Sequence, residues 1–248
     1  YVLGFGPFPI ILSTNLFLWF KDDWFYLQFL MIAVGFLGKE FVRWSRGGRS
    51  VHIFNPSAFS LGLFSIGLLV AGATDISWGQ QIASTLSLAP NIYLFLFSVG
   101  LVVMYFFSIT LIAGSAAATL FILSAIYSGW SGVPYFVDSE IPTAVFLGLL
   151  LLVTDPSTSP RSQLGKIFFG CFYGLGVFGL YSFLGFLGVP TFYDKLLCVP
   201  LLNLSVERID KLASHVVERV HSNFSAVESL DLRKNGFHMV LWVMLFLI

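Results

Sequence analysis

The chain has 248 residues and no net charge; 57% of its residues are hydrophobic and only 10% are charged. A soluble domain carries about 25% charged residues, so this chain has too few polar side chains to cover a water-soluble fold of its length. Zero net charge also gives no support to nucleic-acid binding. The mean hydropathy of +0.87 instead predicts a chain surrounded by membrane lipids.

The apolar runs are continuous, without the alternation of a transmembrane β-barrel, and therefore predict membrane-crossing α-helices. In chain order, these runs are 1–20, 24–38, 58–73, 91–130, 141–153, 164–188, 196–204 and 237–248. The run 91–130 is too long for one crossing of about 20 residues, and we divide it near Ser108. The fold class expected is an all-α, polytopic transmembrane bundle of about eight or nine segments. The runs 141–153 and 196–204 are short and are expected to be short or re-entrant segments.

Lysine and arginine residues orient the predicted helices. Apart from Lys21 and Lys195, they all lie in the segments 39–49, 161–166 and 208–234. Counting the crossings places these three segments on one side, which the positive-inside rule makes cytoplasmic. We therefore expect a multi-pass protein of the bacterial cytoplasmic (inner) membrane.

Residues 205–235 differ from the rest of the chain, because apolar residues recur there at helical spacing with charges between them. This pattern is typical of an amphipathic helix on the cytoplasmic surface, and a plain linker helix is the alternative. The domain organisation expected is a transmembrane domain over 1–204, this helix or linker over 205–235, and the start of a further transmembrane helix over 236–248. The chain is expected to be incomplete at both ends.

Two short motifs could carry chemistry, Asn55-Pro56-Ser57 and Asp155-Pro156-Ser157. Asn or Asp before Pro favours a turn or a helix cap, and Pro suits the first helical position. Hydroxyls and free backbone amides at a helix N-terminus bind anions, phosphate included. The cofactor-binding residues expected are therefore Asn55, Ser57, Asp155, Ser157 and Thr158. Capping alone is the alternative, and the likeness of the motifs suggests an internal repeat.

A family resemblance rests on three ordered segments. Phe54-Asn55-Pro56-Ser57-Ala58-Phe59 resembles the NPAAF-like motif of the RnfD/NqrB family, the membrane subunits of the Rnf and sodium-translocating NADH:quinone reductase complexes. Leu152-Val153-Thr154-Asp155-Pro156-Ser157 resembles the family's ATDP-like motif. Leu201-Leu202-Asn203-Leu204, followed by Ile209-Asp210, resembles its LLMN…PLID-like segment. The resemblance covers residues 35–210 and implies a divergent membrane subunit of an electron-transfer complex, with other integral-membrane subunits and lipids as partners.

The resemblance also implies a flavin, which family members carry as FMN joined through phosphate to a Thr in an SGAT-like motif. The nearest string here, Ser115-Ala116-Ala117-Ala118-Thr119, lies inside an apolar run, and the loop 132–140 has no Thr. The turn before the last motif is also altered, at 190–195. Covalent FMN is therefore not expected, and the cofactor implied is non-covalent FMN or a quinone.

Other redox centres lack ligands in this sequence. Only His238 lies inside an apolar run, and the chain has two cysteines, whereas an iron–sulfur cluster usually needs four. We expect no haem, iron–sulfur cluster or other metal site, and no catalytic residue is assigned. Two other functions stay open: a cofactor-free structural subunit of a larger respiratory or photosynthetic complex, and a small-solute or ion channel or transporter using the broken-helix turns.

Overall fold

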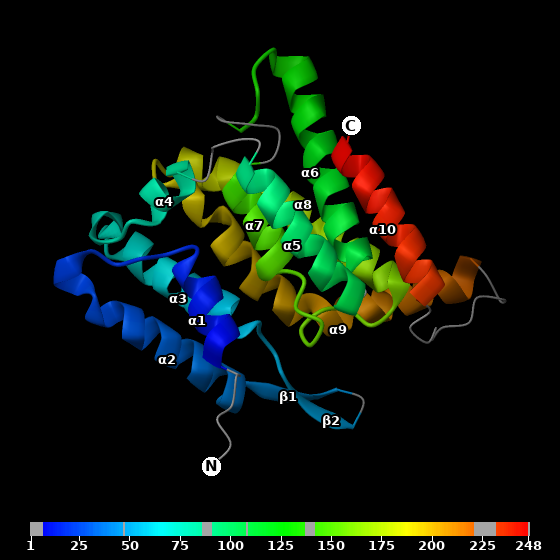
Figure 1. Cartoon of the computed structure of the whole chain (residues 1–248), viewed down its shortest axis with the longest axis horizontal. Helices are drawn as coiled ribbons and strands as arrows, with labels where there is room; N and C mark the ends of the chain where they lie inside the picture. Colours follow the sequence, from blue (N-terminus) through cyan, green and yellow to red (C-terminus); the bar gives the residue numbers. More distant parts are fainter. Residues whose placement is uncertain are drawn as a thin grey trace.

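The computed structural model describes residues 7–46, 48–85, 91–107, 109–136, 142–220 and 232–247, and these are mostly helical (Figure 1). The α-helices are α1 (Pro7–Asn15), α2 (Tyr26–Phe41), α3 (Pro56–Val70), α4 (Gly79–Thr85), α5 (Asn91–Phe107), α6 (Thr110–Ser131), α7 (Thr143–Leu151), α8 (Gln163–Phe186), α9 (Asp194–Val220) and α10 (Leu232–Leu247). Three 3-10 turns are η1 (Asp22–Trp24), η2 (Thr74–Ile76) and η3 (Thr191–Tyr193). The chain is thus helical, as the sequence predicts.

Two of these helices, α6 with 22 residues and α8 with 24, are long and apolar enough to cross a membrane. Helix α3 and the Leu94–Phe107 part of α5 are apolar but shorter. The predicted division of the run 91–130 near Ser108 is confirmed, because α5 ends at Phe107 and α6 begins at Thr110. The expected short segment at 141–153 forms α7, a helix of nine residues.

The basic segment 39–49, expected as a loop, is divided between the end of α2 and a β-hairpin. Its strands β1 (Arg43–Arg46) and β2 (Arg49–His52) are antiparallel, with Arg43 opposite His52 and Arg46 opposite Arg49. Gly48 has a φ of +76°, and a tight turn accepts that conformation most readily at glycine. The all-α prediction is therefore wrong at this point, because a four-residue pairing across a turn leaves little hydropathy signal.

Helix α9 runs without a break through the expected domain boundary between residues 204 and 205. Its single proline, Pro200, lies inside the helix and cannot donate a hydrogen bond to the carbonyl of Leu196. That carbonyl faces Gly62 of α3, where an added Cβ would lie 3.1 Å from the oxygen. Residues 221–231 of the expected cytoplasmic segment lie outside the described residues, and α10 begins at Leu232, ahead of the predicted start at 236.

The two longest apolar helices, α6 and α8, pack closely and run parallel. Gly170 of α8 lies against the Ile112 carbonyl and the Ser115 hydroxyl of α6, and Gly174 lies one turn further along, against Thr119. Glycines four residues apart let two helix backbones approach closely. Helix α9 packs on α8, and α10 packs on α6 and α5 (Figure 1). The α6–α8 pair is therefore the centre of the bundle.

We predict that Gly170→Ala lowers the stability of the protein by about 1–3 kcal/mol, because the added methyl would overlap α6 atoms that cannot easily move. At Gly170 the new Cβ would lie 3.0 Å from the backbone nitrogen of Ala116 and closer still to the Ile112 carbonyl. Circular dichroism during thermal unfolding in detergent measures the effect.

Gly179→Ala is the matched control on the same helix, because no described atom lies within 4 Å of a Cβ added at Gly179. That change should stabilise α8 slightly, by up to about 1 kcal/mol, through helix propensity. Equal effects of the two substitutions would contradict the close approach of α6 and α8.

Candidate functional site

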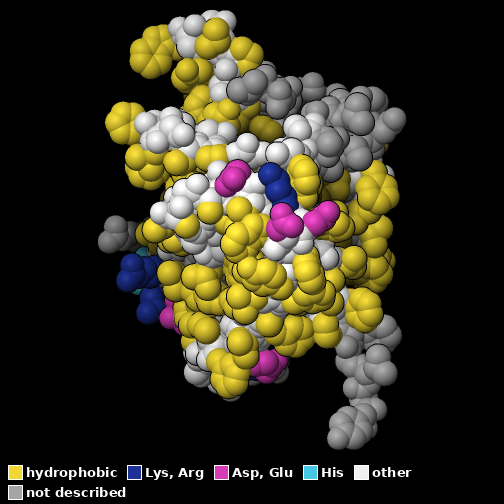
Figure 2. Space-filling view, turned by 90° about the vertical axis from the view of Figure 1, so that its left-hand side faces the viewer, with side chains coloured by type: hydrophobic (Ala, Val, Ile, Leu, Met, Phe, Trp, Pro, Cys, Tyr) yellow, Lys and Arg dark blue, Asp and Glu magenta, His cyan; other side chains and the backbone are white. Residues whose placement is uncertain are grey.

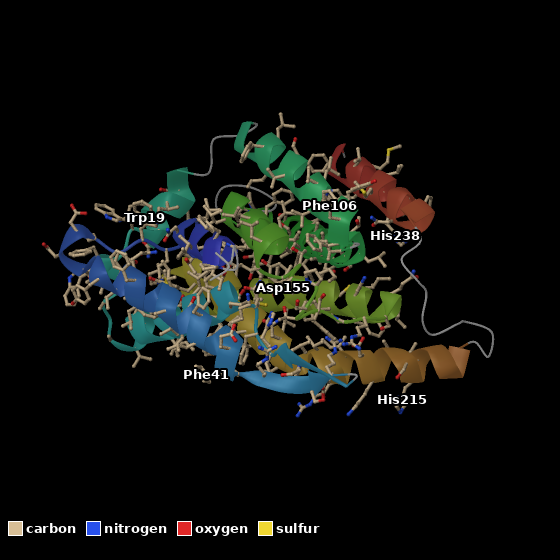
Figure 3. All side chains as sticks on the ribbon, turned by 60° about the horizontal axis from the view of Figure 1, so that its bottom comes forward. Trp19, Phe41, Phe106, Asp155, His215 and His238 are labelled. Carbon is tan, nitrogen blue, oxygen red and sulfur yellow. The ribbon has the colours of Figure 1, made fainter. Side chains whose placement is uncertain are left out.

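Three polar segments that are distant in the sequence meet in one network, which we call the polar junction. They are the Asn55 end of α3, the loop 152–162 between α7 and α8, and the part of α9 that carries Asn203 and Asp210. Figure 3 shows Asp155 of this loop in the middle of the molecule, with elements on all sides in that view. The three segments are also the three that carry the family resemblance.

Asn55 and Asn203 bind these segments to one another. The side-chain oxygen of Asn55 caps α3 by accepting from the amides of Ser57 (3.0 Å) and Ala58 (3.1 Å), and its Nδ2 donates to the Leu152 carbonyl (3.1 Å). The backbone amide of Asn55 donates to Oδ1 of Asn203 (3.0 Å). Nδ2 of Asn203 in turn donates to the Thr158 carbonyl (3.2 Å). Both asparagines are buried, so each polar atom needs the partner that it has.

The carboxylate of Asp210, on α9, lies at the start of α8 and forms the second half of the polar junction. Asp210 forms an ion pair with Arg46 of β1 and accepts hydrogen bonds from the Arg161 amide (3.2 Å) and the Ser162 hydroxyl (3.1 Å). Arg46 also donates to the Ser159 carbonyl (2.9 Å), and Arg161 donates to the Arg46 carbonyl (3.2 Å). The helix dipole and free amides favour a negative charge at this helix end, and Asp210 supplies it from within the chain.

His52 and Asp155 form the outer edge of the polar junction. Nε2 of His52 lies 3.4 Å from Oδ2 of Asp155, and their side chains are 15% and 18% exposed. Oδ1 of Asp155 accepts from the Ser157 amide (2.9 Å), which forms a turn of the loop. Ser157 itself is exposed. Among the expected site residues, Asp155 and Ser157 are thus the two that reach the surface.

The two Pro-containing motifs take different structures. The predicted helix cap is confirmed at Asn55, where Pro56 occupies the first position of α3. At Asp155 the motif forms the predicted turn and not a cap, because its Oδ1 accepts from the Ser157 amide. Helix α8 begins only at Gln163 and is capped by the hydroxyl of Ser162 (3.0 Å to the Gly165 amide). The likeness of the two motifs is therefore local, and it does not reflect equivalent positions in a repeat.

The expected cofactor-binding residues do not fit the phosphate of a flavin. Asn55, Ser57 and Thr158 are buried, and protein groups take up their polar atoms: the Ser57 hydroxyl bonds to that of Ser13, and the Thr158 amide donates to the Asp155 carbonyl (3.2 Å). The Asp155 carboxylate would repel a phosphate at the edge that Asp155 and Ser157 form, and at the other exposed edge Asp210 already occupies the start of α8. Within the described ranges, no group of three His, Cys, Asp or Glu side chains is placed to hold a metal ion.

The SGAT-like string of α6 serves helix packing. Its hydroxyls bond to their own helix, Ser115 to the Leu111 carbonyl and Thr119 to the Ser115 carbonyl (both 2.7 Å), and they lie against Gly170 and Gly174 of α8. Residues 137–140 of the loop 132–140, the expected place of an attachment site, lie outside the described residues.

Sequence reasoning missed Arg46, Ser159 and Ser162, which complete the polar junction. From the sequence, Arg46 was expected only as one of the basic residues that orient the predicted helices. Its buried side chain depends on a partner more than 160 residues away, which one sequence gives no means to find. The capping role of Ser162 had a signal, because Ser commonly precedes the first helical residue.

A second charged pair lies away from the polar junction. Lys195, which lies outside the three basic segments of the sequence, is buried and forms an ion pair with Asp194 (3.0 Å) at the start of α9. Its ammonium also lies 4.5 Å from the centre of the Phe192 ring. A buried charge needs such partners, so the exception has a structural explanation.

Comparisons of the chain with protein-family models, with curated proteins and with solved structures found no significant match.

We predict that Asp210→Asn lowers the free energy of unfolding by about 2–3 kcal/mol, because it leaves the buried Arg46 guanidinium without its counter-charge. Chemical or thermal unfolding in detergent measures the loss. The control is Glu40→Gln, which removes an exposed partner 3.7 Å from Arg43 and should change stability by less than about 0.5 kcal/mol. A neutral result for Asp210→Asn would refute the importance of this ion pair.

A double-mutant cycle tests whether the polar junction acts as a unit. Asn55→Ala and Asn203→Ala should each cost about 1–3 kcal/mol, through the lost cap and the unsatisfied carbonyls. Together they should cost less than the sum by at least about 0.5 kcal/mol, because both hold the same loop. Ser98→Ala, at an exposed site on α5, should combine additively with Asn203→Ala. Additivity of the two asparagine changes would show that the segments are independent.

Proposed function

We propose that the chain is a polytopic integral protein of the bacterial cytoplasmic membrane. The two long apolar helices α6 and α8 support this proposal, as do the shorter apolar helices α3 and Leu94–Phe107. Large hydrophobic side chains are exposed along the helices, among them Phe41, Val70, Trp130 and Phe186, each at least 79% exposed. Figure 2 shows one face of the molecule that is mostly hydrophobic, with few charged side chains. Such a large apolar surface is unfavourable in contact with water and favourable in contact with lipid.

Within the membrane, we propose that the chain serves as a subunit of an electron-transfer complex of the RnfD/NqrB type. One observation carries this proposal: the three segments that resemble the family's motifs meet in the polar junction. Unrelated chance likenesses would have no reason to contact one another across the fold. The motif residues also have specific roles there, since Asn55 caps α3 and Asn203 links two other segments.

The contacts favour a structural role for the polar junction in this complex. Its buried asparagines and hydroxyls bond to protein groups, so the junction holds α3, α9 and the loop 152–162 together and does not bind a flavin phosphate. A cofactor-free subunit that packs against other integral-membrane subunits is therefore the form of the proposal that the geometry supports best. A flavin or quinone carried by the subunit would have to be held by other residues.

Purification of the natural, full-length protein from its own membranes under mild detergent tests the proposal. We expect redox subunits to co-purify, as identified by mass spectrometry, and we expect no flavin fluorescence on this chain in a denaturing gel. Isolation of the protein alone, with no redox partner and no flavin absorbance in the native sample, would contradict the assignment and favour the channel or transporter.

A further inference from the structure

One exposed face of α9 changes along its length from apolar to basic. The exposed residues on this face recur at helical spacing, with Lys211 and Leu212 side by side at one turn: Leu201, Leu204, Arg208, Lys211, Leu212 and His215. At 3.6 residues per turn this spacing places them in one stripe. Leucines occupy the part of the stripe nearer to Asp194, and cations begin four residues after Leu204, about 6 Å further along the axis.

The basic part of this stripe lines an open groove of about 410 Å³, with Leu212 and Val216 between the polar side chains. Arg208 and Lys211 are exposed and have no ion-pair partner within the described residues. Of the neighbouring acids, Asp210 is bonded to Arg46 and Ser162 on the other side of the helix, and Glu207, one turn before Lys211, is half-buried and forms no ion pair with a described cation. Nδ1 of His215 donates to the Lys211 carbonyl (2.8 Å), which holds the ring beside the cations, and Figure 3 shows His215 on the outer side of α9.

We propose that this α9 stripe binds one anionic phospholipid, with its phosphate at Arg208 and Lys211 and its acyl chains along Leu201 and Leu204. The inference rests on the proposed membrane location. Arg208 and Lys211, which have no ion-pair partner among the described residues, attract the anionic headgroup. The adjoining leucines contact the acyl chains of the same lipid. A free phosphate ion would use only the cations, and an acidic protein segment would leave the leucines without a matching surface. The order of apolar and basic residues along one stripe therefore favours a lipid.

The test uses the full chain, purified in detergent and incubated with equal amounts of dioleoyl phosphatidylglycerol and dioleoyl phosphatidylcholine. Native mass spectrometry counts the retained lipids. We expect the wild-type chain to prefer phosphatidylglycerol, and Arg208→Gln/Lys211→Gln to reduce that preference by about fivefold for each charge removed. The charge-preserving swap Arg208→Lys/Lys211→Arg should keep most of the preference.

The matched control is Lys39→Gln/Arg43→Gln, which removes two positive charges from α2 and β1, outside the stripe, and should leave the preference unchanged. Circular dichroism of each variant should show the wild-type helix content and unfolding temperature. Equal lipid preference of the wild type and the Arg208/Lys211 variant would overturn the proposal. Displacement of the lipid by an equal concentration of inorganic phosphate would also overturn it, and so would cross-linking of Lys211 to an acidic protein subunit in the native complex.

Alkaline carbonate extraction of native membranes separates this inference from the proposed function. Wild type and variant should both stay in the membrane fraction, because the apolar helices hold them there. Release of the wild-type chain would contradict the membrane proposal itself. Retention of both chains with equal lipid preference would refute the lipid site alone.

Discussion

The side chain of Asn203 fixes how the main parts of the molecule meet. It accepts from the amide of Asn55 at the start of α3 and donates to the Thr158 carbonyl in the loop before α8. Because Asn203 is fully buried, an unmade bond here would cost the desolvation of a polar group without compensation. Asparagine suits this position because its amide has both a donor and an acceptor, so one side chain can serve a free amide and a free carbonyl from two segments.

The Asp210–Arg46 pair adds charge to the same arrangement. Arg46 reaches the carboxylate from a hairpin that has few other contacts with the bundle, and its side chain is only 9% exposed. A guanidinium so placed is stable only with a counter-charge and with its donors used, which Asp210 and the Ser159 carbonyl provide. The hairpin is thereby attached to the loop 152–162 and to α9, and the start of α8 receives a negative charge.

The sequence predicted the parts of this structure that depend on local signals. The length of the uncharged run 91–130 required a break near Ser108, and the Asn-Pro pair at 55–56 predicted a helix cap. It failed where distant contacts decide the outcome. Asp155 has the same local signal as Asn55, which allows a turn or a cap, and the sequence does not show that Asp155 takes the turn and that its carboxylate also faces His52. The continuity of α9 past residue 204 was also hidden, because a change from apolar to amphipathic composition looks like a boundary, although both parts favour a helix.

The candidate site was predicted in part of its members but not in its chemistry. Asn55, Asp155 and Asn203 were recognised through a motif resemblance, which says nothing about which atoms are free. The bonds that fill their polar atoms come from backbone groups, such as the Leu152 and Thr158 carbonyls. Backbone groups are present at every position, so the sequence cannot show which of them will be available. Only the structure therefore shows which polar atoms of these residues are already hydrogen-bonded to the protein and which are free to bind a ligand.

The side chains of the polar junction differ in their exposure, with the asparagines buried and the carboxylates partly exposed, and this difference fits the proposed membrane location. Asn203 is 0% exposed and Asn55 is 6% exposed, whereas the side chains of Asp155 and Asp210 are 18% and 24% exposed. On α9, Asn203 directly precedes Leu204 of the α9 stripe, whereas the Asp210 side chain is bonded to Arg46 and Ser162 on the other side of the helix. The loop 152–162 has no buried side-chain oxygen or nitrogen without a hydrogen-bond partner, which suits an irregular segment at membrane depth. In the proposed membrane location the charged groups of the polar junction would lie toward water, and an ion or proton that exchanges with the polar junction would first meet Asp210 or the His52–Asp155 pair.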